Sequence, residues 1–120
     1  KMSIEFDVTS RSVPVGTSKP VRFRLVNPNN GQPVNGQKDV TVLYYRSDGR
    51  GRAVVAARAL PEGGYEAEVR LGSPSTYYVF VGSRSLDLGY SDLPFLSLMG
   101  TPAPSEDKES TTQAQGGSGT

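Results

Sequence analysis

Several short segments of the chain alternate apolar and polar residues, and this alternation constrains the fold more than any other feature of the sequence. In the clearest segment, residues 65–71, four apolar side chains alternate with Glu66, Glu68 and Arg70. Successive side chains of an extended strand point to opposite faces, so a period of two predicts a strand with one buried and one solvated face. Residues 3–9, 20–26 and 65–71 alternate in this way. Four further short segments rich in apolar, β-branched or aromatic residues, 39–46, 53–59, 76–82 and 93–99, complete a set of seven predicted strands.

Turn-forming residues separate these segments. The 120 residues include 14 Gly and 9 Pro, and two Asn-Gly pairs end at Gly31 and Gly36. Strands spaced by about 8–12 residues, with turns between them, are typical of β-sandwiches. We therefore predict an all-β, seven-stranded antiparallel sandwich of immunoglobulin-like type over residues 1–100. Residues 101–120 are rich in Pro, Ser and Gly, which predicts a flexible, disordered tail or linker.

The composition limits the chemistry that the chain can perform. The sequence has no Cys and no His, which removes thiolate nucleophiles, imidazole bases and the commonest transition-metal ligands. Two carboxylate pairs, Glu66 with Glu68 and Asp87 with Asp92, are expected on a solvated strand face and in a loop, whereas acid–base catalysis needs a protected cleft. We therefore predict that the chain is not an enzyme and has no catalytic, cofactor-binding or metal-binding residues.

Charge and hydropathy argue against two further classes of partner. The formal net charge is +1, and the sequence lacks the run of Lys and Arg that is typical of nucleic-acid binding. No stretch approaches the roughly 20 apolar residues of a membrane span. We therefore expect neither nucleic-acid binding nor direct membrane insertion.

The segment 85–96 keeps apolar side chains in what would otherwise be a polar connection. Such a loop packs either on the open end of its own sandwich, which is the favoured interpretation, or on a partner. Adjacent tyrosines at 44 and 45, and at 77 and 78, must face opposite ways, so one of each pair is expected on a second, partner-covered face. The candidate partner contacts are Leu86, Leu88, Tyr90, Leu93, Phe95, Tyr45 and Tyr78.

The strand and turn motifs resemble those of bacterial immunoglobulin-like modules of exported proteins. The motifs that carry this resemblance are at residues 14–16, 20–25, 31–34, 39–43, 64–66 and 76–81. A narrower pattern, Tyr-Tyr-Val-Phe-Val at 77–81, Ser-Leu at 85–86 and Asp-Leu-Pro-Phe-Leu at 92–96, looks like the module that trails periplasmic, cytochrome-linked, nitrite-reductase-like β-propellers. The propeller carries any haem or substrate site in such proteins, so the resemblance implies an accessory domain without catalytic residues. It also implies a periplasmic or extracellular location and a protein partner, such as a neighbouring domain, a subunit or a β-propeller.

These observations lead to one functional expectation and two alternatives. The expectation is a non-catalytic structural or protein-interaction module of an exported bacterial protein or complex. The first alternative is a module that binds carbohydrate or another ligand through exposed tyrosines. The second is a subunit of a cell-surface fibre or layer, in which an edge strand pairs with the next copy.

Overall fold

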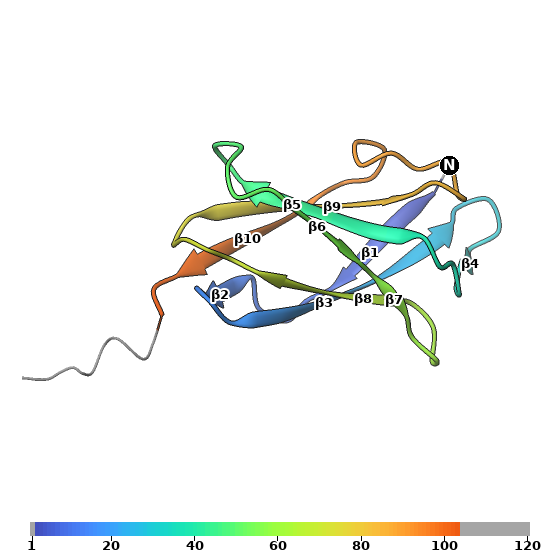
Figure 1. Cartoon of the computed structure of the whole chain (residues 1–120). Coiled ribbons are helices and arrows are strands. Elements are labelled where there is room, and N and C mark those ends of the chain that lie inside the picture. The colour runs from blue at the N-terminus through green and yellow to red at the C-terminus, as the bar shows by residue number, and fades with distance from the viewer. Residues whose placement is uncertain (1, 104–120) are drawn as a thin grey trace, which may run out of the picture.

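The computed structural model describes residues 2–103, which form ten β-strands in two sheets. None of these residues lies in a helix, so this part of the chain has no helix that could span a membrane. Figure 1 shows the strands arranged in two layers. The strands are β1 (Ser3–Asp7), β2 (Ser12–Pro14), β3 (Ser18–Asn27), β4 (Gln32–Pro33), β5 (Val40–Arg46), β6 (Ala53–Ala56), β7 (Arg58–Ala59), β8 (Tyr65–Arg70), β9 (Thr76–Ser83) and β10 (Leu96–Thr101).

The first sheet has the strand order β1-β3-β8-β7, and the short strand β4 pairs with the end of β3. All of its pairings are antiparallel. The register places Phe6 opposite Phe23, and Val21 opposite Ala67, on the inner face of the sheet. The ring of Tyr65 stacks on that of Phe23, with the ring centroids 5.6 Å apart. Apolar residues at alternate positions therefore supply one half of the core, as the period of two predicts.

The second sheet has the strand order β2-β10-β9-β5-β6. Its register aligns Val42 with Val81 on one side and with Val55 on the other, and it aligns Leu98 with Tyr77. These side chains face the first sheet. The inner faces of the two sheets together bury Val13, Val21, Phe23, Leu25, Val40, Val42, Tyr44, Ala57, Tyr65, Ala67, Val69, Leu71, Tyr77, Val79, Val81, Leu93, Leu96 and Leu98.

The prediction of an all-β fold is confirmed, but the structure has ten strands where seven are predicted. The short strand β4 forms between the two Asn-Gly turns, and the other two additional strands arise where the chain changes sheet. The segment 3–9 contributes only β1 to the first sheet, and the chain then crosses to the second sheet as β2. Strand β2 runs parallel to β10, so the prediction of a wholly antiparallel sandwich is wrong at this pair. The crossing buries Val13, which is 1% exposed, in the core.

The segment 53–59, predicted as one strand, also divides between the sheets. Its first half is β6 in the second sheet, and its last two residues are β7 in the first sheet. Between them lies Ala57, which is 5% exposed and donates its backbone N–H to the carbonyl of Val40 at 2.9 Å. Small side chains such as alanine allow the strand to bend into the core at this position.

The last strand lies further along the chain than predicted. Strand β10 begins at Leu96, three residues after the predicted start at Leu93, and it ends at Thr101. Thr101 is therefore paired in the second sheet, opposite Pro14, although the sequence assigns it to the tail. Of the predicted tail, residues 102 and 103 follow β10 outside any strand, and residues 104–120 lie outside the described part of the chain.

Candidate functional site

The outer faces of the two sheets have opposite chemistry. On the outer face of the first sheet, four charged residues of alternating sign lie side by side across the strands. They are Asp7 on β1, Arg22 on β3, Glu66 on β8 and Arg58 on β7. Opposite charges on neighbouring strands stabilise the pairing. The expectation that Glu66 lies on a solvated face is wrong, because its arginine partners cover it, whereas Glu68 is exposed as expected.

Glu66 is the central residue of this row. Its side chain is 7% exposed, and its two carboxylate oxygens accept hydrogen bonds from Arg22 Nε at 2.8 Å and from Arg58 Nη2 at 2.5 Å. These two bonds lower the pKa of Glu66 below its ordinary value of 4.5, and the bond from Arg22 has the larger effect. The carboxylate is therefore held in its charged form by both arginines, which indicates a structural role for it.

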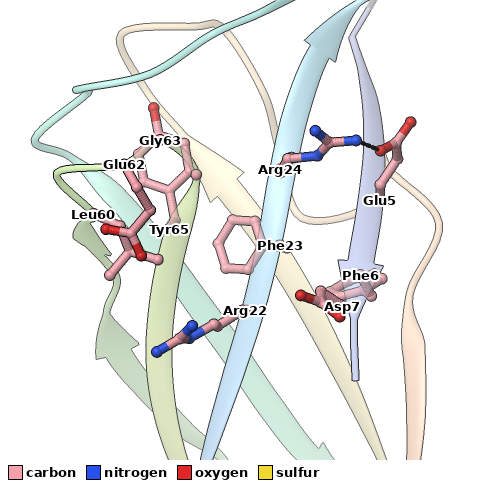
Figure 2. A pocket seen from close by; sticks show the side chains of 11 residues that line it. Glu5, Phe6, Asp7, Arg22, Phe23, Arg24, Leu60, Glu62, Gly63 and Tyr65 are labelled. Carbon is pink, nitrogen blue, oxygen red and sulfur yellow. Dashed lines mark hydrogen bonds and ion pairs between the residues drawn. The ribbon is translucent and has the colours of Figure 1, made fainter. Parts of the chain in front are cut away.

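A hollow of about 360 Å³ lies beside this row, and Figure 2 shows the side chains around it. Arg22 and Arg24 come from β3, Glu5 comes from β1, and Glu62 comes from the hairpin between β7 and β8. Arg24 is paired with Glu5, and Arg22 with Glu66. Because both arginines are already neutralised by carboxylates, the hollow offers no unpaired cation with which to bind an anion.

The outer face of the second sheet carries aromatic side chains instead of charges. Tyr45 of β5, Tyr78 and Phe80 of β9, and Phe95, just before β10, form one connected cluster of rings. Tyr45 stacks on Phe80 with centroids 5.2 Å apart, and Phe95 contacts both Tyr78, at 4.9 Å, and Phe80, at 5.5 Å. These contacts are within the range at which aromatic pairs attract each other.

Apolar residues extend this cluster in both directions across the sheet. Leu43 lies between Phe80 and Val54 in the register. Met99 of β10 lies opposite Thr76, which is two residues before Tyr78 on β9 and therefore on the same face. We call the whole surface the aromatic face, and it comprises Leu43, Tyr45, Val54, Tyr78, Phe80, Phe95 and Met99.

Three residues of the aromatic face are exposed to solvent, Tyr45, Tyr78 and Phe80 are half-buried, and Leu43 is buried. Val54 is 57% exposed, Phe95 is 50% exposed and Met99 is 46% exposed, and they are the large apolar side chains that stand out as exposed in the described residues. The guanidinium of Arg52 lies 5.6 Å from the centroid of the Tyr45 ring, a distance at which a cation is attracted to the ring face. An apolar centre with an arginine beside an aromatic ring is the composition typical of protein interfaces.

The structure brings three of the seven candidate contacts together on this face, namely Tyr45, Tyr78 and Phe95. Their neighbours in the two tyrosine pairs are the buried members, since Tyr44 is 6% exposed and Tyr77 is 3% exposed. The alternation of strand residues therefore assigns one tyrosine of each pair to the core and one to the aromatic face.

The other four candidates pack on the domain itself. Leu93 is 5% exposed and belongs to the core, and Leu86 and Leu88 are half-buried against the core. The hydroxyl of Tyr90 lies 2.8 Å from that of Thr41, and its ring lies over Gly82, where an added Cβ would come within 3.0 Å of it. The segment that carries them thus lies over its own sandwich, in the arrangement that the sequence favours.

One carboxylate fixes the start of this segment. Asp39 accepts hydrogen bonds from the hydroxyl of Ser83 at 2.7 Å and from the backbone N–H of Ser85 at 2.7 Å. These bonds lower the pKa of Asp39 below its ordinary value, and the bond from Ser83 has the largest effect. The segment then turns at Asp87, which has a positive φ of 56°, and Leu88 returns to pair with Ser83.

The sequence-based reasoning missed Leu43, Val54, Phe80 and Met99. The signal for two of them is present, because Leu43 and Phe80 lie two positions from Tyr45 and Tyr78 and therefore share their face. Val54 and Met99 belong to segments in which the alternation alone does not tell the inner face from the outer one. The register against β5 and β9 makes that distinction.

The described residues contain no cluster of three or more Asp or Glu side chains placed to hold a metal ion. The chain matches no protein-family model and has no significant match among curated proteins.

Proposed function

We propose that this chain is a non-catalytic protein-interaction module of immunoglobulin-like type, and that its aromatic face binds a partner protein. The observation that carries the proposal is the contrast between the two outer faces. The first sheet presents charges that are paired with one another, whereas the second presents a connected group of rings and aliphatic side chains, of which Phe95, Val54 and Met99 are exposed. Contiguous apolar patches on otherwise polar surfaces mark interaction sites.

Two features support the immunoglobulin-like assignment. Immunoglobulin constant domains place strands A, B, E and D in one sheet and strands C, F and G in the other, and variable domains add C′ next to C. The orders β1-β3-β8-β7 and β10-β9-β5-β6 correspond to A-B-E-D and G-F-C-C′. In addition, the hydroxyl of Tyr77, near the start of β9, accepts the backbone N–H of Gly72 at 3.2 Å. A tyrosine bonded in this way to the preceding corner is a hallmark of these domains.

The proposed setting is an exported bacterial protein or complex, in the periplasm or outside the cell. Its support is the resemblance of residues 77–81, 85–86 and 92–96 to the module that trails periplasmic β-propellers. In this setting the partner is a neighbouring domain or subunit, and the apolar surface of that partner covers Phe95 and the rings around it.

Photocrosslinking tests the proposal and identifies the partner. A benzophenone side chain at position 95, on the aromatic face, is expected to crosslink the partner in the native cell, whereas the same group at position 24, on the first sheet, is not. Binding of the identified partner is then measured for Phe95→Ser and for the control Arg24→Ser. The few hot-spot residues near the centre of an interface cost about 2 kcal/mol or more when truncated. As the exposed ring of the aromatic face, Phe95 is the expected hot spot, so Phe95→Ser is expected to weaken binding by at least about tenfold. Equal binding by the two variants would refute the proposal.

Carbohydrate binding is a second candidate, because Tyr45 and Tyr78 are half-buried neighbours that carry hydroxyl groups on the outer face of the sheet. Aromatic rings with a polar tip suit the alternating apolar and polar surfaces of a sugar. A change in tyrosine fluorescence on addition of oligosaccharides, lost in Tyr45→Ala, would favour this candidate over a protein partner.

A further inference from the structure

The sheet edges of this protein are protected to different degrees. Strands β1 and β7 end the first sheet, and strands β2 and β6 end the second. An exposed edge invites pairing with another strand, and natural proteins prevent this with charges, proline or very short strands. Strand β1 carries Glu5 and Asp7, β7 has only two residues and carries Arg58, and β2 ends in Pro14. Strand β6 has the sequence Ala-Val-Val-Ala, without a charge or a proline.

The free hydrogen-bonding groups of β6 can be assigned from its register. The backbone N–H of Ala57 donates to the carbonyl of Val40, and the register of β5 with β6 then makes Val42 and Val55 a hydrogen-bonded pair. Such pairs alternate along an antiparallel ladder. The N–H and carbonyl groups of Val54 and Ala56 therefore point away from β5, toward the open edge.

The space beside this edge is not filled by the described residues. A hollow of about 400 Å³ runs along it, and it is lined by Val55, Ala56, Ala57, Arg58, Glu66 and Glu68. Its apolar lining comes from β6 and Ala57, and its far wall carries the two glutamates of β8. A strand added to β6 would lie over this hollow and bring apolar side chains to its inner side.

We infer that the occupant of this edge is β6 of a second copy of the chain, paired antiparallel. With Val55 on the two-fold axis, Val54 of each copy exchanges two hydrogen bonds with Ala56 of the other, so all four free backbone groups of each β6 are satisfied. A strand made of small and apolar residues meets an identical strand without like charges in direct opposition. The contact uses the same surface on both copies, so it closes as a dimer.

The charged residues nearest this edge flank β6, with Arg52 before the strand and Arg58 after it. They therefore lie at the two ends of the pair, outside its four-residue ladder. Because the two-fold axis of an antiparallel pair is perpendicular to the sheet, both aromatic faces lie on the same side of the combined ten-stranded sheet.

Sedimentation equilibrium over a concentration series tests this inference with two matched proline variants. Ala56→Pro removes an N–H that the dimer uses. The control Ala59→Pro changes another exposed alanine. The backbone N–H of Leu60 donates to the carbonyl of Gly64 on the β8 side, so the N–H of the preceding residue, Ala59, points away from β8 to the free edge of β7. The parent chain and Ala59→Pro are expected to reach twice the monomer mass, with dissociation constants within about threefold, whereas Ala56→Pro is expected to stay monomeric with a native circular-dichroism spectrum.

Amide hydrogen exchange gives a readout that does not depend on a substitution. The N–H groups of Val54 and Ala56 are expected to exchange at least about tenfold more slowly in concentrated than in dilute protein, while that of Ala59 is unchanged. A parent chain that stays monomeric to millimolar concentration, a dimer that persists in Ala56→Pro, or a mass that grows beyond the dimer would overturn the inference. It is independent of the proposed function, because Phe95→Ser is expected to lose partner binding and to keep the dimer.

Discussion

Two adjacent tyrosines provide a test of the fold, since they have the same side chain and opposite surroundings. The hydroxyl of Tyr77 accepts the N–H of Gly72 at 3.2 Å and lies 3.0 Å from the hydroxyl of Ser73, which holds the corner between β8 and β9 in place. The hydroxyl of Tyr78 makes no hydrogen bond within the described residues, and its ring is half-exposed on the aromatic face. Replacing each by phenylalanine removes one oxygen atom and keeps the ring.

The expected loss of stability follows from the hydrogen bonds that disappear. Each contributes about 0.5–1.5 kcal/mol, so the loss of two in Tyr77→Phe costs about 1–3 kcal/mol. Gly72 is exposed, and water replaces part of its bond, so we expect about 1–2 kcal/mol for Tyr77→Phe. A surface change without lost contacts costs at most about 0.5 kcal/mol, which is the expectation for Tyr78→Phe.

Urea unfolding followed by circular dichroism measures both variants. The midpoint of Tyr77→Phe is expected to fall with an unchanged m-value, and its Tm is expected to fall by roughly 4–8 °C for each kcal/mol. Equal midpoints for Tyr77→Phe and Tyr78→Phe would refute the assignment of Tyr77 to the corner. A larger loss of stability in Tyr78→Phe would show that Tyr78, not Tyr77, lies on the inner face of β9.

Three further predictions address other parts of the fold. The two arginine partners lower the pKa of Glu66, so the charged carboxylate contributes its full stabilisation above the ordinary value of 4.5 and loses it as the pH falls through the lowered value. Glu66→Gln is therefore expected to be less stable than the parent at neutral pH, and the difference is expected to shrink in acid. Urea midpoints measured across the pH range test this. Leu93→Ala is expected to cost about 2–5 kcal/mol, because Leu93 is 5% exposed in the core, whereas half-buried Leu88→Ala costs less, and a Leu93 effect below that of Leu88 would contradict the packing. A Cβ at Gly100 would collide with the backbone carbonyl of Ser73, so Gly100→Ala is expected to cost about 1–3 kcal/mol in the same assay, and a neutral effect would contradict this close approach.

The alternation of residue types predicted the elements that stay in one sheet along their whole length. The segment 65–71 corresponds to β8, Tyr65–Arg70, and the segment 76–82 corresponds to β9, Thr76–Ser83. Both strands lie in the interior of their sheets, so the inner face of each is buried along the strand. The outer face departs from the period of two at Glu66, which its two arginine partners cover. The all-β class follows from such segments alone.

The two changes of sheet were not predictable in the same way. Whether residues 12–14 continue the first sheet or join β10 depends on contacts with a strand that lies more than 80 residues later in the chain. Likewise, Ala57 is buried because the two sheets approach each other there, and nothing in the run Ala-Val-Val-Ala-Ala-Arg-Ala distinguishes it from its neighbours. Local pattern gives the faces of a strand, whereas the sheet to which it belongs is decided by distant partners.

The candidate surface was predicted in part for a related reason. Adjacent tyrosines must diverge, so the sequence indicates that a second face carries tyrosine. Alternation would place Leu93 and Phe95 on the same face, because one residue separates them. Both residues precede β10, however, and lie outside a regular strand, so the alternation does not apply to them. Consequently Leu93 is buried while Phe95 is 50% exposed, although the two have similar hydrophobicity.

The most direct test of the central claim compares the solvent exposure of the aromatic face in the native complex and in the purified chain. Hydroxyl-radical footprinting reports the solvent exposure of individual side chains. Tyr45, Tyr78 and Phe95 are expected to be labelled less in the native complex than in the purified chain, whereas Leu60, at the hairpin after β7, is expected to be labelled equally in both. Unchanged labelling of all three aromatic residues, or protection of Leu60 alone, would contradict the claim that the aromatic face is the surface that binds a partner.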